Sequence, residues 1–315
     1  MAGLSTPDYP LSFTERHLSW EERKGAQVWP GGARMAVLLY TSLEEWAWDR
    51  IEPLTPHGTL SMPGEKTPNL GMRSAVSYGF HIGLKRLRDM WRDHGLTVML
   101  WVTGNAAEQH PEVVAELASL GHEVGGHGYS EGTPPTLMTR DEQRVNIQRT
   151  VECIERVTGR RPEGWISAGA LVNQDTIELL AEHGFEFDAD LQDDELPYFI
   201  DVKGKTLVEV PFRMVGNVVD LRLWSTQNRY PVDDALRYLT TTFDAYYREA
   251  AVRPLQLNFG SHPFVVGRPD AAWVFAKFLD HMQRHDDVWL TNPGAVARHW
   301  RERFSAGYDL KRSMR

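Results

Sequence analysis

The chain has 315 residues, of which 42% are hydrophobic and 24% charged, and these are the values of an ordinary globular protein that can bury a sizeable core. Its formal net charge of −9 argues against a nucleic-acid or anionic-membrane partner, because the basic surface that such partners require is missing. Cys153 is the only cysteine, which excludes an intrachain disulfide and a zinc cluster of thiolates.

In chain order, apolar runs typical of buried strands alternate with segments that have the spacing of helices. The first run, 33–43, is continuously apolar, as in a strand buried on both faces. A helix predicted over 139–159 begins with a capping box of Thr139 and Glu142 and ends at Gly159. Further strands are predicted over 96–104, 123–127, 163–167, 185–191, 206–212, 255–263 and 287–291, and further helices over 79–95, 110–122, 173–184, 232–250, 269–285 and 293–304.

This alternation continues for about seven strand–helix units without a change in composition, which is typical of one α/β domain with a parallel sheet, open or closed into a barrel. We assign residues 31–305 to this domain. Residues 1–30 have no core pattern of their own and are predicted to pack on the barrel or on a neighbouring subunit, and residues 306–315 form a C-terminal tail. We find neither an export signal nor an apolar run of 18 residues, and therefore expect a cytoplasmic protein without a membrane partner.

Polar side chains gather where the predicted strands end, which is where parallel α/β sheets place their chemistry. A single polar residue there is usually a cap. Acids and histidines that converge from several strands are different, because like charges repel unless a cation, a shared proton or a function compensates. We therefore predict a catalytic rim with the members Ser42, Glu44, Glu45, Thr103, Asn105, His127, Glu131, Ser167, Asp188, Asp190, Asp193, Asp194, Ser261 and His262.

The segment GGHGYSEG, residues 125–132, places His127 and Glu131 four positions apart, the spacing of neighbours on a helical turn. Such a pair could share a metal ion, act as acid and base, or lie unused on the surface. The eleven tryptophans of the chain also allow two interpretations, namely core packing or a site walled by aromatic rings that binds a flat, small ligand.

Across residues 30–300 the chain resembles the polysaccharide deacetylase (NodB-type) superfamily. GHEVGGHGYSEG resembles its H-x-x-x-H histidine motif, and TGRRPEGWIS and SHPFVVGRP resemble later motifs. The pieces LEEW, SYGFHIG, DDELPY and GRPDAAW resemble the cytoplasmic branch that contains metal-independent allantoinases and proteins similar to peptidoglycan deacetylases. The resemblance implies an α/β fold of the distorted (β/α) barrel type.

The resemblance also implies roles for individual residues. Metal-dependent members use an Asp base and an Asp ligand after the first strand, two histidine ligands and a later histidine as general acid. Here Ser42 stands at the base position, Glu44 at the ligand position and Glu131 at the second histidine, whereas His127 and His262 match. Glu44, His127 and Glu131 could still hold zinc or a similar divalent ion. The alternative is a metal-free site, as in the allantoinase branch, in which Glu131 or Glu44 is the base and His127 orients it.

The reaction that the resemblance implies is hydrolysis of a carbon–nitrogen bond in a linear or cyclic amide. Water activated by a metal or a carboxylate would attack the carbonyl, and His262 would protonate the leaving nitrogen. We expect Trp46, Trp165 and Ser167 to bind a small soluble substrate such as a ureide or a cyclic imide. The alternatives are an N-deacetylase of an N-acetyl sugar or peptidoglycan fragment, and an inactive barrel that only binds. We also expect a homo-oligomer, and a supporting role for Asp193 and Asp194 in the loop before Pro197.

Overall fold

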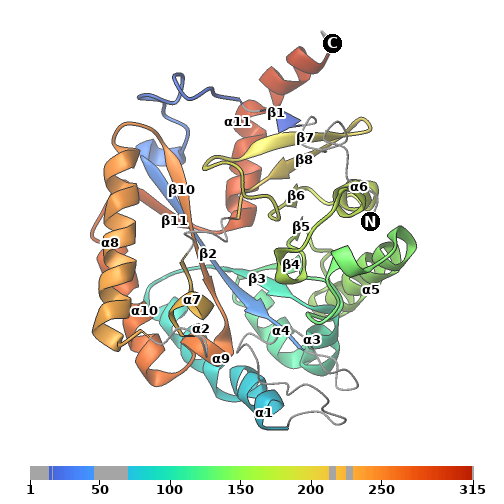
Figure 1. Cartoon of the computed structure of the whole chain (residues 1–315), viewed down its shortest axis with the longest axis vertical. Helices are drawn as coiled ribbons and strands as arrows, with labels where there is room; N and C mark the ends of the chain where they lie inside the picture. Colours follow the sequence, from blue (N-terminus) through green and yellow to red (C-terminus); the bar gives the residue numbers. More distant parts are fainter. Residues whose placement is uncertain (1–13, 16, 46–69, 213–217, 225–229, 314–315) are drawn as a thin grey trace, which may run out of the picture.

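The computed structural model describes residues 14–15, 17–45, 70–212, 218–224 and 230–313, and its strands form a curled sheet with helices on its outer side (Figure 1). The strand order is β1-β7-β8-β6-β5-β4-β3-β2-β10-β9, and β11 also pairs with β2. The strands are β1 (Thr14–Glu15), β2 (Met35–Leu43), β3 (Met99–Val102), β4 (Glu123–Gly126), β5 (Gly164–Trp165), β6 (Phe187–Asp188), β7 (Tyr198–Val202), β8 (Lys205–Glu209), β9 (Val218–Val219), β10 (Leu255–Ser261) and β11 (Val288–Thr291).

Every pairing from β8 round to β9 is parallel, and among the described strands β7 and β1 run antiparallel to their neighbours. This agrees with the predicted distorted (β/α) barrel. The α-helices are α1 (Leu70–Tyr78), α2 (Leu84–Asp93), α3 (Gly104–Gln109), α4 (Pro111–Ser119), α5 (Arg140–Thr158), α6 (Gln174–Glu182), α7 (Asp220–Leu223), α8 (Val232–Ala250), α9 (Pro263–Val266), α10 (Pro269–Met282) and α11 (Pro293–Ser313). Shorter turns are η3 (Pro30–Gly32), η4 (Gly79–Gly83), η5 (Pro135–Leu137) and η6 (Ala168–Ala170).

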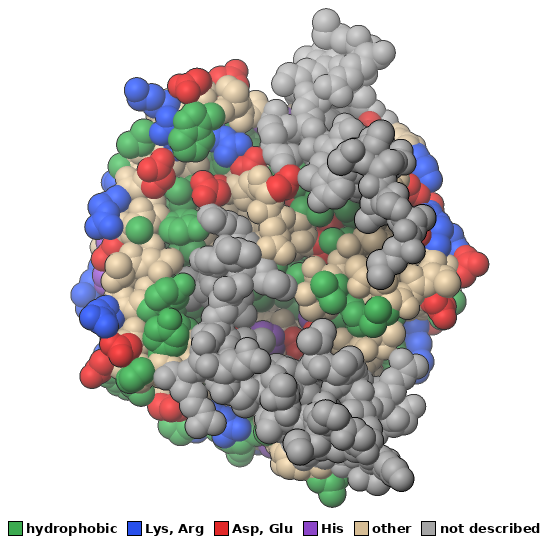
Figure 2. All heavy atoms as spheres, in the orientation of Figure 1, with side chains coloured by type: hydrophobic (Ala, Val, Ile, Leu, Met, Phe, Trp, Pro, Cys, Tyr) green, Lys and Arg blue, Asp and Glu red, His purple; other side chains and the backbone are tan. Residues whose placement is uncertain are grey.

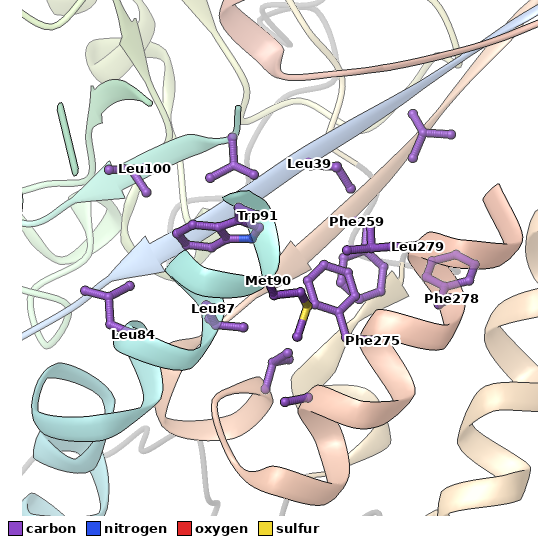
Figure 3. Packing of buried hydrophobic residues seen from close by; sticks show 14 of the residues in the cluster. Leu39, Leu84, Leu87, Met90, Trp91, Leu100, Phe259, Phe275, Phe278 and Leu279 are labelled. Atoms are coloured by element: carbon purple, nitrogen blue, oxygen red, sulfur yellow. The ribbon is translucent and has the colours of Figure 1, made fainter. Parts of the chain in front are cut away.

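The strand β2 is buried on both faces, and this explains its unbroken apolar run. Because side chains alternate along a strand, Leu38 and Tyr40 point into the barrel, where they join a cluster with Trp101. Val37 and Leu39 point the other way, toward the helices. Figure 3 shows this outer cluster, in which Leu39 lies among side chains of α2, α10 and β10, including Leu87, Met90, Trp91, Phe259, Phe275 and Leu279.

The helix predicted over 79–95 differs from the structure, because the helical segment begins at Leu70 and contains the π-helical turn η4. Gly83 in that turn packs against α9. A Cβ atom at residue 83 would overlap the carbonyl oxygen of Pro263, so only glycine allows this approach. The contact matters for the site, because α9 follows directly on His262.

The hairpin of β7 and β8 was not predicted. Its two-residue turn has positive φ at Lys203 (49°) and Gly204 (89°), as in a type I′ turn. The dipeptide Lys–Gly was the available signal. The predicted C-terminal tail also differs, since α11 continues through it to Ser313.

The described part of the N-terminal extension packs on its own barrel. The strand β1 pairs with β7, and Val28 and Trp29 are buried in the inner cluster. Arg23 forms a two-bonded ion pair with Asp194, at 2.7 and 2.9 Å. None of the helices in the described ranges is both long and apolar enough to span a bilayer.

Candidate active site

Four predicted site residues meet at the carboxyl ends of the strands. Glu44 follows β2, His127 follows β4, Glu131 lies in the loop after His127, and His262 follows β10. The side chains of Glu44, His127, Glu131 and His262 are no more than 11% exposed. Figure 2 shows histidine and acidic side chains together in a recess near the centre of this face.

The distances between these groups are short. Oε1 of Glu44 lies 3.1 Å from Nε2 of His262 and 3.6 Å from Nε2 of His127. The same His127 nitrogen lies 3.1 Å from Oε2 of Glu131. The structure therefore brings all four residues within reach of one small molecule.

Two glycines explain how His127 reaches this position. Gly125 and Gly126 end β4, and the rings of Trp101 and Trp165 lie where their Cβ atoms would be. Only glycine allows the indoles to pack on the strand this closely. After the strand, Gly128 turns the chain with a φ of 77°, so that Glu131 faces back toward His127. The glycine-rich sequence around His127 is thus a packing requirement of the strand and its turn.

Backbone groups hold the side chains of His127 and Glu131 in place. Nδ1 of His127 donates to the carbonyl of Ile166 at 2.9 Å, a bond that directs Nε2 toward the carboxylates. Oε1 of Glu131 accepts the backbone N–H of Gly169 at 2.9 Å. Its other oxygen, Oε2, is buried and lies 3.1 Å from Nε2 of His127. A buried carboxylate oxygen that faces an imidazole nitrogen can share a cation or a proton with it.

Asp220 is a site residue that the sequence analysis missed. It is fully buried at the start of α7, and its carboxylate contacts His262 twice. Oδ1 accepts Nδ1–H of the ring at 2.8 Å, and Oδ2 accepts the backbone N–H of His262 at 2.6 Å. This leaves Nε2 of His262 as the nitrogen that faces Glu44. The sequence signal was weak, because β9, the strand before Asp220, has only two residues.

Burial and the charges of the neighbouring groups both shift the pKa values of the four site residues, and for Glu44, His127 and His262 these two effects oppose each other. Burial raises the pKa of Glu44, but the neighbouring His262 and His127 outweigh it and lower this pKa to about 2. Burial lowers the pKa of His127, but Glu131 and Glu44 raise it to about 10. Burial and then the charge of Glu44 raise the pKa of Glu131. His262 also has a pKa well above its ordinary value, since Asp220 and Glu44 outweigh its burial.

The donor set fits a divalent metal ion. One ligand atom each from Glu44, His127 and Glu131 lie within 4.8 Å of one another. One imidazole and two carboxylates are ligands that zinc accepts, with positions left for water and substrate. The two buried carboxylates that face the same nitrogen of His127 are the observation that favours a cation there.

The remaining predicted site residues lie in different places. Ser167 and Trp165 are buried beneath the site, where Nε1 of Trp165 donates to Oγ of Ser167 at 3.2 Å. The ring of Trp165 belongs to a core cluster, whereas we expected it to bind substrate as part of an aromatic wall. Ser42 is buried in β2. Trp46 lies outside the described residues.

Ser167 directs its hydroxyl and its backbone N–H to Asp190, at 2.6 and 2.7 Å. Asp190 belongs to a buried acidic group with Asp188 and Glu209, which are direct neighbours across β6 and β8. Burial raises the pKa of Asp190 to about 6, and burial and mutual charge raise those of Asp188 and Glu209 well above their ordinary values. Asp188 and Asp190 are among the predicted rim residues, whereas Glu209 was not predicted, and all three lie beneath the site.

Asp193 and Asp194 have structural contacts, in keeping with the predicted supporting role. Asp193 accepts the hydroxyl of Tyr198 at 2.6 Å. Asp194 accepts the backbone N–H groups of Glu195 and Leu196, as in an Asx turn, and also binds Arg23. Glu45, the neighbour of Glu44, is bound through its carboxylate to His110 at 2.9 Å.

A curled parallel sheet with a histidine–carboxylate site at its carboxyl end defines a hydrolase of the barrel-fold deacetylase class. The chain is similar to the polysaccharide deacetylase family of carbon–nitrogen hydrolases, whose model matches residues 80–187.

The relatives cover most of the chain. A peptidoglycan deacetylase of Helicobacter pylori is 26% identical over 262 residues, which are 73% of this chain and 87% of that protein. The crystal structure of PuuE allantoinase is 28% identical, has a TM-score of 0.79, and covers 87% of this chain and 93% of its own. The structure of a probable polysaccharide deacetylase from Pseudomonas aeruginosa PAO1 is also 28% identical, with a TM-score of 0.79, and covers 87% of this chain and 93% of its own.

Proposed function

We propose that the protein hydrolyses a carbon–nitrogen bond in a small, soluble amide such as a ureide or a cyclic imide. The observation that carries this proposal is the enclosure of the site, because Glu44, His127, Glu131 and His262 are all buried or nearly so. A small molecule can enter such a recess, whereas a polymer needs an open groove. The similarity to an allantoinase structure over most of both chains favours the same substrate class.

His262 is proposed as the general acid. Asp220 holds Nδ1–H of the ring, so Nε2 carries the proton that is given to the leaving nitrogen. The raised pKa of His262, which Asp220 and Glu44 cause against its burial, keeps the ring protonated before the reaction. This supply of a proton is what an amide needs, because an amine anion is a poor leaving group.

In the metal-free alternative, Glu131 is proposed to accept the proton of the attacking water. Its pKa is raised by burial and by Glu44, which makes it a stronger base than Glu44, whose pKa is lowered to about 2. Ser42, at the position of the superfamily's Asp base, has no group that can do this. The contact with Gly169 N–H keeps the Glu131 carboxylate turned toward His127.

Glu44, His127 and Glu131 are proposed to hold a divalent ion, with zinc as the first candidate. When bound, such an ion supplies Lewis acidity at the substrate carbonyl and balances the two carboxylates. The protein's own contribution is to hold these three side chains in fixed directions through the carbonyl of Ile166, the N–H of Gly169 and the contact of Glu44 with His262.

A second candidate function is N-deacetylation of an N-acetyl sugar. The observation that favours it is the similarity to the Helicobacter pylori peptidoglycan deacetylase over 73% of the chain. The acetamide carbonyl of an N-acetyl sugar is less activated than the carbonyl of an imide. In addition, Ser42 stands where deacetylases of the superfamily have their Asp base. We therefore rank it second.

A substrate panel tests the proposal. Purified protein, treated with chelator and then given zinc or buffer, is incubated with cyclic ureides, cyclic imides and N-acetylglucosamine oligomers, with His262→Gln as the inactive control. We expect ring opening of a ureide or imide by the parent protein and at least a 100-fold smaller rate in the variant. Acetate release from the oligomers alone would assign the second function. No turnover of any substrate would identify a barrel that only binds.

A further inference from the structure

Asp190 lies beneath the site and is joined to His127 by one peptide unit. Nδ1 of His127 donates to the carbonyl oxygen of Ile166 at 2.9 Å. The N–H of the same peptide, which belongs to Ser167, donates to Oδ1 of Asp190 at 2.7 Å. Oγ of Ser167 donates to the other oxygen, Oδ2, at 2.6 Å. The peptide between Ile166 and Ser167 thus has a carboxylate on one side and an imidazole on the other.

The hydrogen bonds on the two sides of this peptide, to His127 and to Asp190, are buried. His127, Ile166, Ser167 and Asp190 are each no more than 5% exposed. A bond from a peptide N–H to a carboxylate is charge-assisted and polarises the amide, which makes its carbonyl oxygen a better acceptor. In this buried position the polarisation is little screened. The carbonyl of Ile166 therefore binds Nδ1–H of His127 more tightly than an ordinary peptide would.

We propose that Asp190 is a positioning residue for His127, which acts through the Ile166–Ser167 peptide to hold the ring with Nδ1 protonated and Nε2 directed at Glu44 and Glu131. The inference rests on the proposed metal-holding role of His127. Asp190, in the layer below, would support that role. Hydrogen-bond partners of a metal-binding histidine fix the orientation of its ring and strengthen its bond to the metal.

The other two acids of the buried group do not make this connection. Glu209 accepts the backbone N–H of Leu191, and Asp188 is its neighbour across the strands. Only Asp190 accepts both donors of Ser167. Burial raises the pKa of Asp190 to about 6, so it is ionised at pH 8, whereas burial and neighbouring acids raise the pKa values of Asp188 and Glu209 well above their ordinary range. Glu209→Gln is therefore a matched control in the same buried group.

Zinc affinity, measured at pH 8 by competition with a chromogenic chelator, tests the proposal. Asp190→Asn keeps the shape of the side chain but removes its charge. We expect it to weaken zinc binding about 10-fold or more. Glu209→Gln should change the affinity less than about threefold, and so should Ser167→Ala, which keeps the peptide N–H. Equal losses in Asp190→Asn and Glu209→Gln, or no loss in Asp190→Asn, would overturn the proposal.

A second measurement does not need zinc or an intact variant. In metal-free parent protein labelled with 15N in its histidines and backbone, we expect a downfield amide proton of Ser167 and a slowly exchanging Nδ1–H of His127. An ordinary Ser167 amide shift, or a His127 ring with its single proton on Nε2, would overturn the proposal even if Asp190→Asn does not fold. Failure of the proposed function has a different signature, namely no zinc binding or no turnover by the parent protein.

Discussion

Glu131 adds an anionic oxygen where the superfamily pattern has a neutral imidazole, so the site is one charge more negative. If the site holds zinc, the added charge should strengthen the hold on the ion and make it a weaker Lewis acid, because each anionic ligand reduces the acidity that the metal passes on. Such a site is suited to an activated carbonyl, as in an imide or ureide, rather than to an acetamide. This one substitution therefore connects the donor set with the proposed substrate class.

Glu131→Gln tests that connection. The amide keeps an oxygen for Gly169 N–H but loses the charge, so we expect zinc content and turnover to fall together, with zinc affinity lower by about 10- to 100-fold. Excess zinc should partly restore both. Elemental analysis and turnover at two zinc concentrations measure this, with the exposed Glu112→Gln as control. An unchanged zinc content and unchanged turnover would reduce Glu131 to a structural residue, and a blank metal analysis in both proteins would indicate a metal-free site.

Asp220→Asn tests the partner of His262. The change removes the charge behind Nδ1 and should lower kcat by about 100-fold with little change in KM, because the group acts on proton transfer rather than on binding. The loss should shrink for substrates whose leaving nitrogen is already acidic. A uniform loss over all leaving groups would contradict the role of His262 as general acid.

At the scale of elements, the short strands β6 and β8 bring Asp188 and Glu209 together inside the fold. Burial, and then the charge of neighbouring acids, raises both pKa values well above those of the unfolded chain. The folded protein therefore binds protons that the unfolded chain releases above about pH 4. The stabilisation from the neutral pair is complete below that pH and is lost as the pH rises through the folded-state pKa values.

The double variant Asp188→Asn/Glu209→Gln should remove this pH dependence. Its side chains imitate the protonated acids, so its free energy of unfolding should exceed that of the parent protein by more than about 1 kcal/mol at pH 8 and by little below about pH 4. Urea unfolding at several pH values measures the difference. A constant difference at all pH values would mean that the pair does not change protonation on folding.

At the scale of the whole molecule, an N-terminal segment closes over the barrel. The strand β1 extends the sheet beyond β7, and Arg23 binds Asp194 next to the turn that precedes β7. Both charged groups are mostly buried, with side chains 12% and 6% exposed. A buried two-bonded pair is costly to break, since the remaining partner keeps an unpaired charge.

Asp194→Asn should therefore lower the free energy of unfolding by about 2 kcal/mol while leaving kcat nearly unchanged. The exposed pair of Arg237 and Asp234 offers a control, and Asp234→Asn should change stability by less than about 0.5 kcal/mol. Urea unfolding and a turnover assay check both variants. Loss of all turnover in a folded Asp194→Asn protein would assign a catalytic role to Asp194 instead.

A homo-oligomer remains our expectation from the family resemblance. The N-terminal segment no longer supports a homo-oligomer, because residues 17–33 contact their own barrel. Light scattering should give a mass well above the 35.9 kDa of one chain, and a mass near that value would refute the expectation.

Local signals in the sequence were sufficient for most of the elements and for four site residues. The continuous apolar run of β2, the Thr139 capping box of α5 and the residues after the strands are properties of neighbouring positions, and the parallel sheet brings such strand ends to one rim. Glu44, His127, Glu131 and His262 could be predicted for that reason, with the family resemblance supplying their roles.

Tertiary structure decided what depends on contacts between distant segments. Asp220 meets His262 across 42 positions of the chain, and Asp190 reaches His127 only through a peptide of a third strand. Trp165, expected at the substrate, is instead packed over Gly126, because a glycine strand leaves room for an indole that no pattern along the sequence reveals. The sequence by itself determined which strands end in reactive groups. Which partners hold those groups was decided by the folding of the sheet, since those bonds form only when remote strands lie side by side.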